Sequence, residues 1–180
     1  RTVAGQQVGI IGLTTVETPF ISSPGNNIVF NQAALSVQKA ADELAGRGVN
    51  KLILLSHQGY AEDRQLASAV SGIDVIVGGH SHTLLGDFTA IGVASAGPYP
   101  TLAKDRDGAQ VLVVHANEWG KFLGDLRLDF DARGAVSSWE ARPKAVVGRQ
   151  WFRVYDLPNL KGEPKRVQFA RDASGGVGLA

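Results

Sequence analysis

The sequence predicts a mixed α/β fold in which strands and helices alternate before the chain turns to β-hairpins. Up to residue 77, short apolar runs are separated by segments with helical spacing, and from residue 111 the apolar residues follow strand patterns only. Strands that alternate with helices favour a sheet with crossover connections. We therefore expect an α/β (α+β-like) architecture.

In the first half, strands are expected at residues 7–13, 49–55 and 73–77, with a loop at 19–27. A helix is predicted at about 32–45, because apolar residues recur there at helical spacing. Asn31 is its expected N-cap. A shorter helix is predicted at about 62–69, where Asp63 in an acidic first turn is attributed to the helix dipole.

In the second half, residues 111–114 form a continuous apolar run, which is typical of a buried strand. Residues 126–131 alternate between apolar and charged side chains, the pattern of a half-exposed strand. A turn at 132–134 then predicts a hairpin with 135–139. Residues 86–101, rich in Gly, Ala and Pro, are expected to form a surface loop that could cover a site.

Histidines follow two of the predicted strands. His80 and His82 come directly after residues 74–77, behind the Gly78-Gly79 pair, and His57 follows residues 52–56. In an extended segment residues i and i+2 project to one side, and open α/β sheets place their sites at the carboxyl ends of strands. Neutral imidazole is the commonest metal-binding side chain, so the three histidines suggest a metal site. A single strand-end histidine is more often a hydrogen-bonded structural residue.

The sequence around these histidines resembles the 5′-nucleotidase family of calcineurin-like metallophosphatases. The resemblance covers about the first 140 residues in the right order, and no match is evident beyond Pro143. It divides the chain into 1–142, the family-like part, and 143–180, a basic tail of unknown role. The segments that carry it include Gly9-Ile10-Ile11-Gly12-Leu13, Leu54-Leu55-Ser56-His57-Gln58-Gly59, Gly78-Gly79-His80-Ser81-His82 and Trp119-Gly120-Lys121.

The resemblance implies a fold that is half of a metallophosphatase β-sandwich flanked by helices. The family's Asp-x-His and Gly-Asn-His-Glu motifs do not occur here. We therefore expect the C-terminal half of a catalytic domain, completed by a missing N-terminal half or a companion chain. That part would supply the bridging carboxylate, the remaining ligands and the catalytic His.

By resemblance, the intact parent is a two-metal phosphoesterase. His57 and His80 would ligate one divalent ion and His82 the other, with Zn, Mn, Fe or similar ions as the expected metals. The parent would hydrolyse phosphate monoesters, with 5′-nucleotides as expected substrates, through a metal-bound hydroxide. The isolated chain is expected to be inactive.

Three other polar residues are candidates for supporting the ligands. Asp74 begins a predicted strand, and carboxylates often orient metal-bound imidazoles. His115 ends the 111–114 run, where the family usually has a different polar residue. Asn117 lies in a turn that is near the active-site mouth in relatives, although a tight structural turn explains it equally well.

Composition limits the partners. The formal charge of +1 and pI of about 8.2 give no field that would imply nucleic acid or an acidic membrane. The chain contains no Cys, which excludes thiolate ligands, and no apolar run of membrane-spanning length. The resemblance implies a periplasmic, cell-surface or secreted location. The alternative function is a non-catalytic structural subunit, or a degenerate metallophosphatase piece, in an envelope assembly.

Overall fold

The computed structural model describes residues 1–3, 5–146, 152–153, 166–167, 169–171 and 177–179. Its centre is a five-stranded mixed sheet with the order β3-β4-β5-β7-β6. Four neighbouring strands are parallel: β3 (Gly9–Leu13), β4 (Leu52–Ser56), β5 (Val75–Val77) and β7 (Gln110–Val114). The edge strand β6 (Thr101–Lys104) runs antiparallel to β7. The predicted α/β class with crossover connections is thus confirmed.

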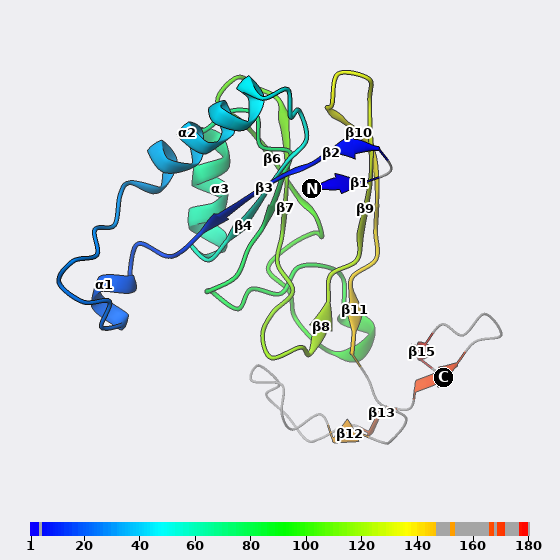
Figure 1. Ribbon diagram of the computed structural model, residues 1–180. Helices are drawn as coiled ribbons and strands as arrows, with labels where there is room; N and C mark the ends of the chain where they lie inside the picture. Colours follow the sequence, from blue (N-terminus) through cyan, green and yellow to red (C-terminus); the bar gives the residue numbers. More distant parts are fainter. Residues whose placement is uncertain (4, 147–151, 154–165, 168, 172–176, 180) are drawn as a thin grey trace.

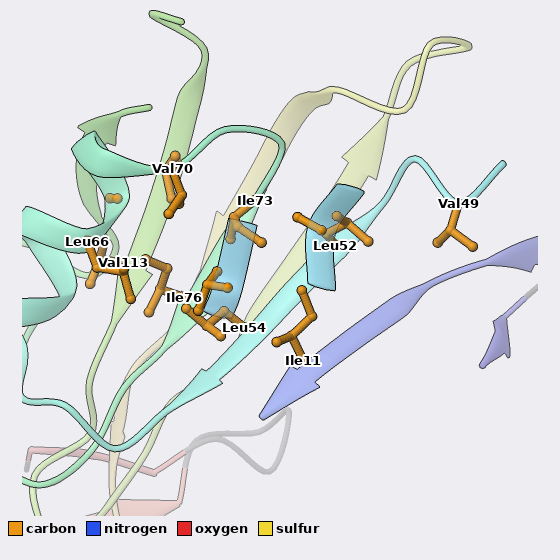
Figure 2. Packing of buried hydrophobic residues seen from close by; sticks show 13 residues of the cluster. Ile11, Val49, Leu52, Leu54, Leu66, Val70, Ile73, Ile76 and Val113 are labelled. Carbon is orange, nitrogen blue, oxygen red and sulfur yellow. The ribbon is translucent and has the colours of Figure 1, made fainter. Parts of the chain in front are cut away.

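Two helices cover one face of this sheet (Figure 1). They are α2 (Ala33–Gly46) and α3 (Tyr60–Ala69). Val37 and Ala41 of α2 are almost fully buried, as the helical spacing predicted. Figure 2 shows how Leu66, Ile76 and other apolar side chains gather between helix and sheet. Helix α2 begins one residue later than expected, with Gln32 rather than Asn31 as its N-cap and no side-chain capping hydrogen bond.

The predicted hairpin packs on the opposite face. It consists of β9 (Leu126–Phe130) and β10 (Val136–Ala141), paired antiparallel. Leu128 and Val136 pack against Leu112 and Val114 of β7, whereas Val111 and Val113 face the helices. The run 111–114 is therefore continuously apolar because both of its faces are buried. The result is three layers: helices, sheet and hairpin (Figure 1).

The segment 86–101 is largely irregular and in part exposed, as predicted for a surface loop, but it also contributes side chains to the interior. Phe88 and Val93 are buried there in a small apolar cluster with Leu84 and Phe122, and the rings of Phe88 and Phe122 lie 4.7 Å apart. Scattered apolar residues among Gly and Pro show no periodicity, so the sequence did not reveal the cluster. The segment also holds the 3-10 turn η1 (Thr89–Ile91).

The remaining elements are short. Residues 144–145, just past the predicted boundary at 142, still pair with β8, while most of the basic tail lies outside the described residues.

In the part of the chain that the structure describes, no helix is both long and apolar enough to cross a bilayer. The short elements are α1 (Thr18–Ile21), β1 (Thr2–Val3), β2 (Gln6–Gln7), β8 (Phe122–Leu123), β11 (Lys144–Ala145), β12 (Phe152–Arg153), β13 (Arg166–Val167), β14 (Phe169–Arg171) and β15 (Val177–Leu179).

Candidate functional site

All four histidines of the chain lie at one edge of the central sheet. His57 follows β4, His80 and His82 follow β5, and His115 follows β7. These three strands are parallel neighbours, so their carboxyl ends meet at the same edge. This is the position at which open α/β sheets bind ligands.

His57 and His80 are the two predicted ligands that the structure brings together. Their ring centroids are 5.1 Å apart, with the ring planes at 60°. Gly79 makes this approach possible, because a Cβ atom at that position would lie 3.0 Å from His57 Nδ1. Glu17, in the loop after β3, reaches the same pair: its Oε2 lies 2.9 Å from His80 Nε2. No local pattern in the sequence singled out Glu17.

His82 contacts Glu118 of the loop after β7. Its Nδ1 is 2.7 Å from Glu118 Oε2. The expectation that His80 and His82 project to one side required an extended backbone. The chain turns here, with φ of 72° at His80 and 51° at His82, so the expected alternation of side chains does not apply.

Backbone strain is concentrated beside these histidines. Within the described residues, the non-glycine positions with positive φ are His80, His82, Asn117 and Trp119. All four lie in the loops after β5 and β7, which are joined where the Asn117 N–H donates to the Thr83 carbonyl at 2.9 Å. Such conformations cost about 1–3 kcal/mol each and tend to cluster at functional sites.

A buried network lies behind the histidine loops. Asp63 Oδ2 is 2.8 Å from His115 Nε2, and Asp63 Oδ1 accepts a hydrogen bond from Ser56 Oγ at 2.5 Å. The Asp63 and His115 side chains are 0% and 1% exposed. Gly78 borders the pair so closely that a methyl group there would overlap it. Asp63 does lie in the first turn of α3, but the helix dipole does not account for a buried carboxylate with these two partners.

Asp74 lies at the other end of the sheet. It precedes β5, and its Oδ2 accepts a hydrogen bond from the Leu52 N–H, at the start of β4, at 2.7 Å. His57 is separated from that point by the length of β4, about 16 Å at 3.3 Å per residue. Burial raises the pKa of Asp74 to about 6, against the lowering effects of the Leu52 hydrogen bond and the Lys51 charge. Asp74 therefore secures two strands and does not orient an imidazole.

The loop after β7 presents an aromatic side chain to solvent. Trp119 is 81% exposed, and Lys121 Nζ lies 4.3 Å from the centroid of its ring. Lys121 Nζ is also 3.5 Å from Glu118 Oε1. Glu118 thus contacts both Lys121 and His82. Sequence reasoning selected its neighbour Asn117 and assigned Glu118 no role.

The residues present fit part of a metal centre. Imidazole nitrogens suit zinc, iron and similar ions, and His57 and His80 are close enough to face one ion. Over residues 1–146 except residue 4, and in the short described stretches beyond, no group of three or more His, Asp or Glu side chains is placed to hold one. A complete centre would need donors in addition to these.

The fold and site define an α/β protein with a histidine-bearing loop cluster at the carboxyl edge of its sheet. No family model matches the chain. It is 44% identical to human 5′-nucleotidase over 143 residues, 78% of this chain and 25% of that protein. It is 46% identical to the snake venom 5′-nucleotidase of Naja atra over 168 residues, 92% of this chain and 31% of that protein.

Solved structures give the same result. The chain matches the 5′-nucleotidase precursor of Thermus thermophilus with a TM-score of 0.78 and 50% identity, covering 81% of this chain and 29% of that one. It matches the Haemophilus influenzae NAD nucleotidase with a TM-score of 0.80 and 30% identity, covering 100% and 33%. The chain belongs to the 5′-nucleotidase family, and spans about a quarter to a third of the length of these relatives.

The similarity extends further than the motifs indicated. The alignment with the Naja atra protein covers 92% of the chain, more than residues 1–142 can supply. It must therefore include residues after Pro143, where the sequence alone showed no match. Basic and aromatic side chains scattered among prolines form no motif, so only an alignment of the whole length reveals the relationship.

Proposed function

We propose that this chain is part of a two-metal phosphoesterase that hydrolyses phosphate monoesters, with 5′-nucleotides as its substrates. The observation that carries the proposal is the approach of the His57 and His80 rings at the carboxyl edge of the sheet. Relatives named 5′-nucleotidases, at 44% and 46% identity, support the substrate class. Because these relatives are longer than this chain, we assign the activity to a larger protein or assembly that contains it.

His57 and His80 would hold one divalent ion, and His82 would contribute to a second. Bound ions of this kind neutralise phosphate oxygens and lower the pKa of water. The chain's own residues prepare the ligands: Asp63 holds Ser56, whose Oγ accepts a hydrogen bond from the Gln58 N–H at 3.2 Å. The backbone on both sides of His57 is thereby fixed.

The remaining donors would come from outside this chain. We therefore expect the isolated 180-residue chain to be inactive. The division into residues 1–142 and a basic tail, 143–180, of unknown role is kept as a prediction. Relatives from snake venom favour a periplasmic, cell-surface or secreted location.

A non-catalytic structural subunit is the second candidate. It is favoured by the absence of a three-donor metal group among the residues with described positions. In this case the histidines would be remnants, and His80 would be held by its contact with Glu17.

Native mass spectrometry of the protein purified with its companions would distinguish the two. A companion chain and about two metal ions per assembly, with phosphate release from AMP, are expected for the enzyme. His80→Ala should abolish the activity, whereas Gln65→Ala, at an exposed position of α3, should not. An assembly without metal and without phosphate release would establish the structural role. Activity in the isolated chain, lost in His80→Ala, would overturn its expected inactivity.

A further inference from the structure

We infer that Glu17 is the positioning residue of His80: it accepts the hydrogen of Nε2, holds the ring beside His57 and leaves Nδ1 as the ligating atom. The inference rests on the proposed function, because it gives His80 a metal ion to meet. Glu17 lies in the loop after β3, and His80 follows β5. The contact therefore joins the ends of two strands that are separated by β4 in the sheet.

The contact between the two side chains is a hydrogen bond, with Glu17 Oε2 2.9 Å from His80 Nε2. An ionised carboxylate can only accept hydrogen bonds, so Nε2 carries the hydrogen. In the neutral ring the lone pair is then on Nδ1, which is the atom able to bind an ion. The side chains of Glu17 and His80 are 58% and 26% exposed. At such exposure the pair adds little to stability, so its effect is on the orientation of the ring.

Glu17 is itself held in place by its backbone. Its N–H donates to Thr15 Oγ1 at 3.2 Å, and its carbonyl accepts from the Phe20 N–H at 2.8 Å. Thr15 is only 4% exposed, so this turn has a buried anchor. The same loop is tied to the loop after β4, because Gln58 Nε2 donates to the Thr14 carbonyl. The carboxylate thus approaches the imidazole from a fixed turn.

Glu17 acts on the ring and is not a third ligand. Among the described residues, no three His, Asp or Glu side chains are placed to hold one ion, although the rings of His57 and His80 lie 5.1 Å apart. Glu17 meets His80 at Nε2, the nitrogen that remains when Nδ1 binds a metal. Carboxylates that orient ligating imidazoles in this way typically change metal affinity by about 10–100-fold when removed.

Nitrogen-15 NMR and nuclear Overhauser contacts of the histidine side chains test the ring position in the full 180-residue chain. At about pH 8, where an ordinary imidazole is neutral, His80 should be the Nε2–H form, and its ring protons should contact those of His57. In Glu17→Ala this contact should weaken severalfold, and the Nε2 hydrogen should exchange faster with water. Glu17→Gln should retain both features, because its amide oxygen still accepts. Glu43→Ala, which removes the same charge from an exposed position of α2, is the matched control and should change neither.

Urea unfolding of the same variants separates positioning from a structural role. Glu17→Ala and Glu43→Ala should unfold at the same urea concentration as the wild type. A clearly lower midpoint for Glu17→Ala alone would mean that Glu17 serves the fold, and would overturn the inference. An Nδ1–H form of His80 in the wild type, or an unchanged ring contact in Glu17→Ala, would overturn it as well.

The metal test uses the assembly purified with its companions, because the proposed function places the other donors outside this chain. Zn²⁺ is returned after treatment with a chelator, and the Zn²⁺ bound per assembly is measured by elemental analysis. Glu17→Ala should need about 10–100-fold more Zn²⁺ for half occupancy than the wild type, and Glu17→Gln should remain close to it. An unchanged requirement in Glu17→Ala overturns the inference. A wild-type assembly that binds no Zn²⁺ counts against the proposed function, while the NMR measurements still decide whether Glu17 holds the ring.

Discussion

Replacing Asp63 with alanine should destabilise this protein far more than the loss of an acidic residue from a first helical turn usually would. The carboxylate is fully buried and has two partners, Ser56 Oγ at 2.5 Å and His115 Nε2 at 2.8 Å. Alanine would leave the imidazole, 1% exposed, without an acceptor and without access to water. The cost is therefore that of an unpaired buried polar group, added to the loss of a hydrogen bond from the serine.

The magnitude follows from these contacts. Leaving a buried polar group unsatisfied costs about 1–3 kcal/mol, and the lost hydrogen bond from the serine adds about 0.5–1.5 kcal/mol. We expect a loss of about 2–4 kcal/mol for Asp63→Ala. This is a large share of the roughly 5–15 kcal/mol that is typical of a domain.

Urea unfolding followed by circular dichroism at neutral pH measures this loss. Glu62→Ala is the matched control, because it removes the same charge from the same turn at an exposed position. Its effect should stay within about 0.5 kcal/mol. A double-mutant cycle with His115→Leu should give a coupling energy of about 0.5–3 kcal/mol. Equal losses for Asp63→Ala and Glu62→Ala would refute the buried-pair argument and restore the helix-dipole interpretation.

Three further predictions concern stability. Gly78→Ala should cost about 1–3 kcal/mol in thermal unfolding, because its methyl group would overlap the buried pair, whereas Gly12→Ala, with nothing within 4 Å, should be nearly neutral. Asp74 has a folded-state pKa of about 6, raised from 3.8, so the wild type should lose stability as pH rises through this range. Asp74→Asn should remove that loss. In urea unfolding, the increase in the free energy of unfolding that Asp74→Asn gives should be larger at pH 8 than at pH 4, by about 1 kcal/mol after allowance for partial exposure. An equal increase at both pH values would contradict the raised pKa of Asp74. Phe122→Ala should cost about 3–5 kcal/mol, whereas Leu123→Ala, 55% exposed, should cost far less; equal losses would mean that the small apolar cluster contributes little.

Sequence and structure agree best where the burial of one face of a helix or strand sets the spacing of its apolar residues. Val37 and Ala41 are buried at the helical spacing that predicted α2, and the alternation at 126–130 predicted the half-buried strand β9. The agreement fails where burial has no period. Phe88 and Val93 lie in a turn-rich segment, and their burial depends on Phe122, which is distant in the chain.

The two longer helices, most strands of the central sheet and the exit of histidines from two apolar strands could be predicted from the sequence, because periodicity and strand ends are local properties. The edge strand β6 was not predicted, and α1 lies partly in the segment 19–27 that was expected to be a loop. The sequence also carried the family resemblance, since short motifs in order survive where the overall length differs. Which side chains contact one another could be read from the folded structure alone. Asp63 pairs with His115 across 52 positions, and Glu17 reaches His80 across 63. No local pattern predicts such contacts, because they depend on which strands become neighbours in the sheet and on how the strained loops at its edge turn.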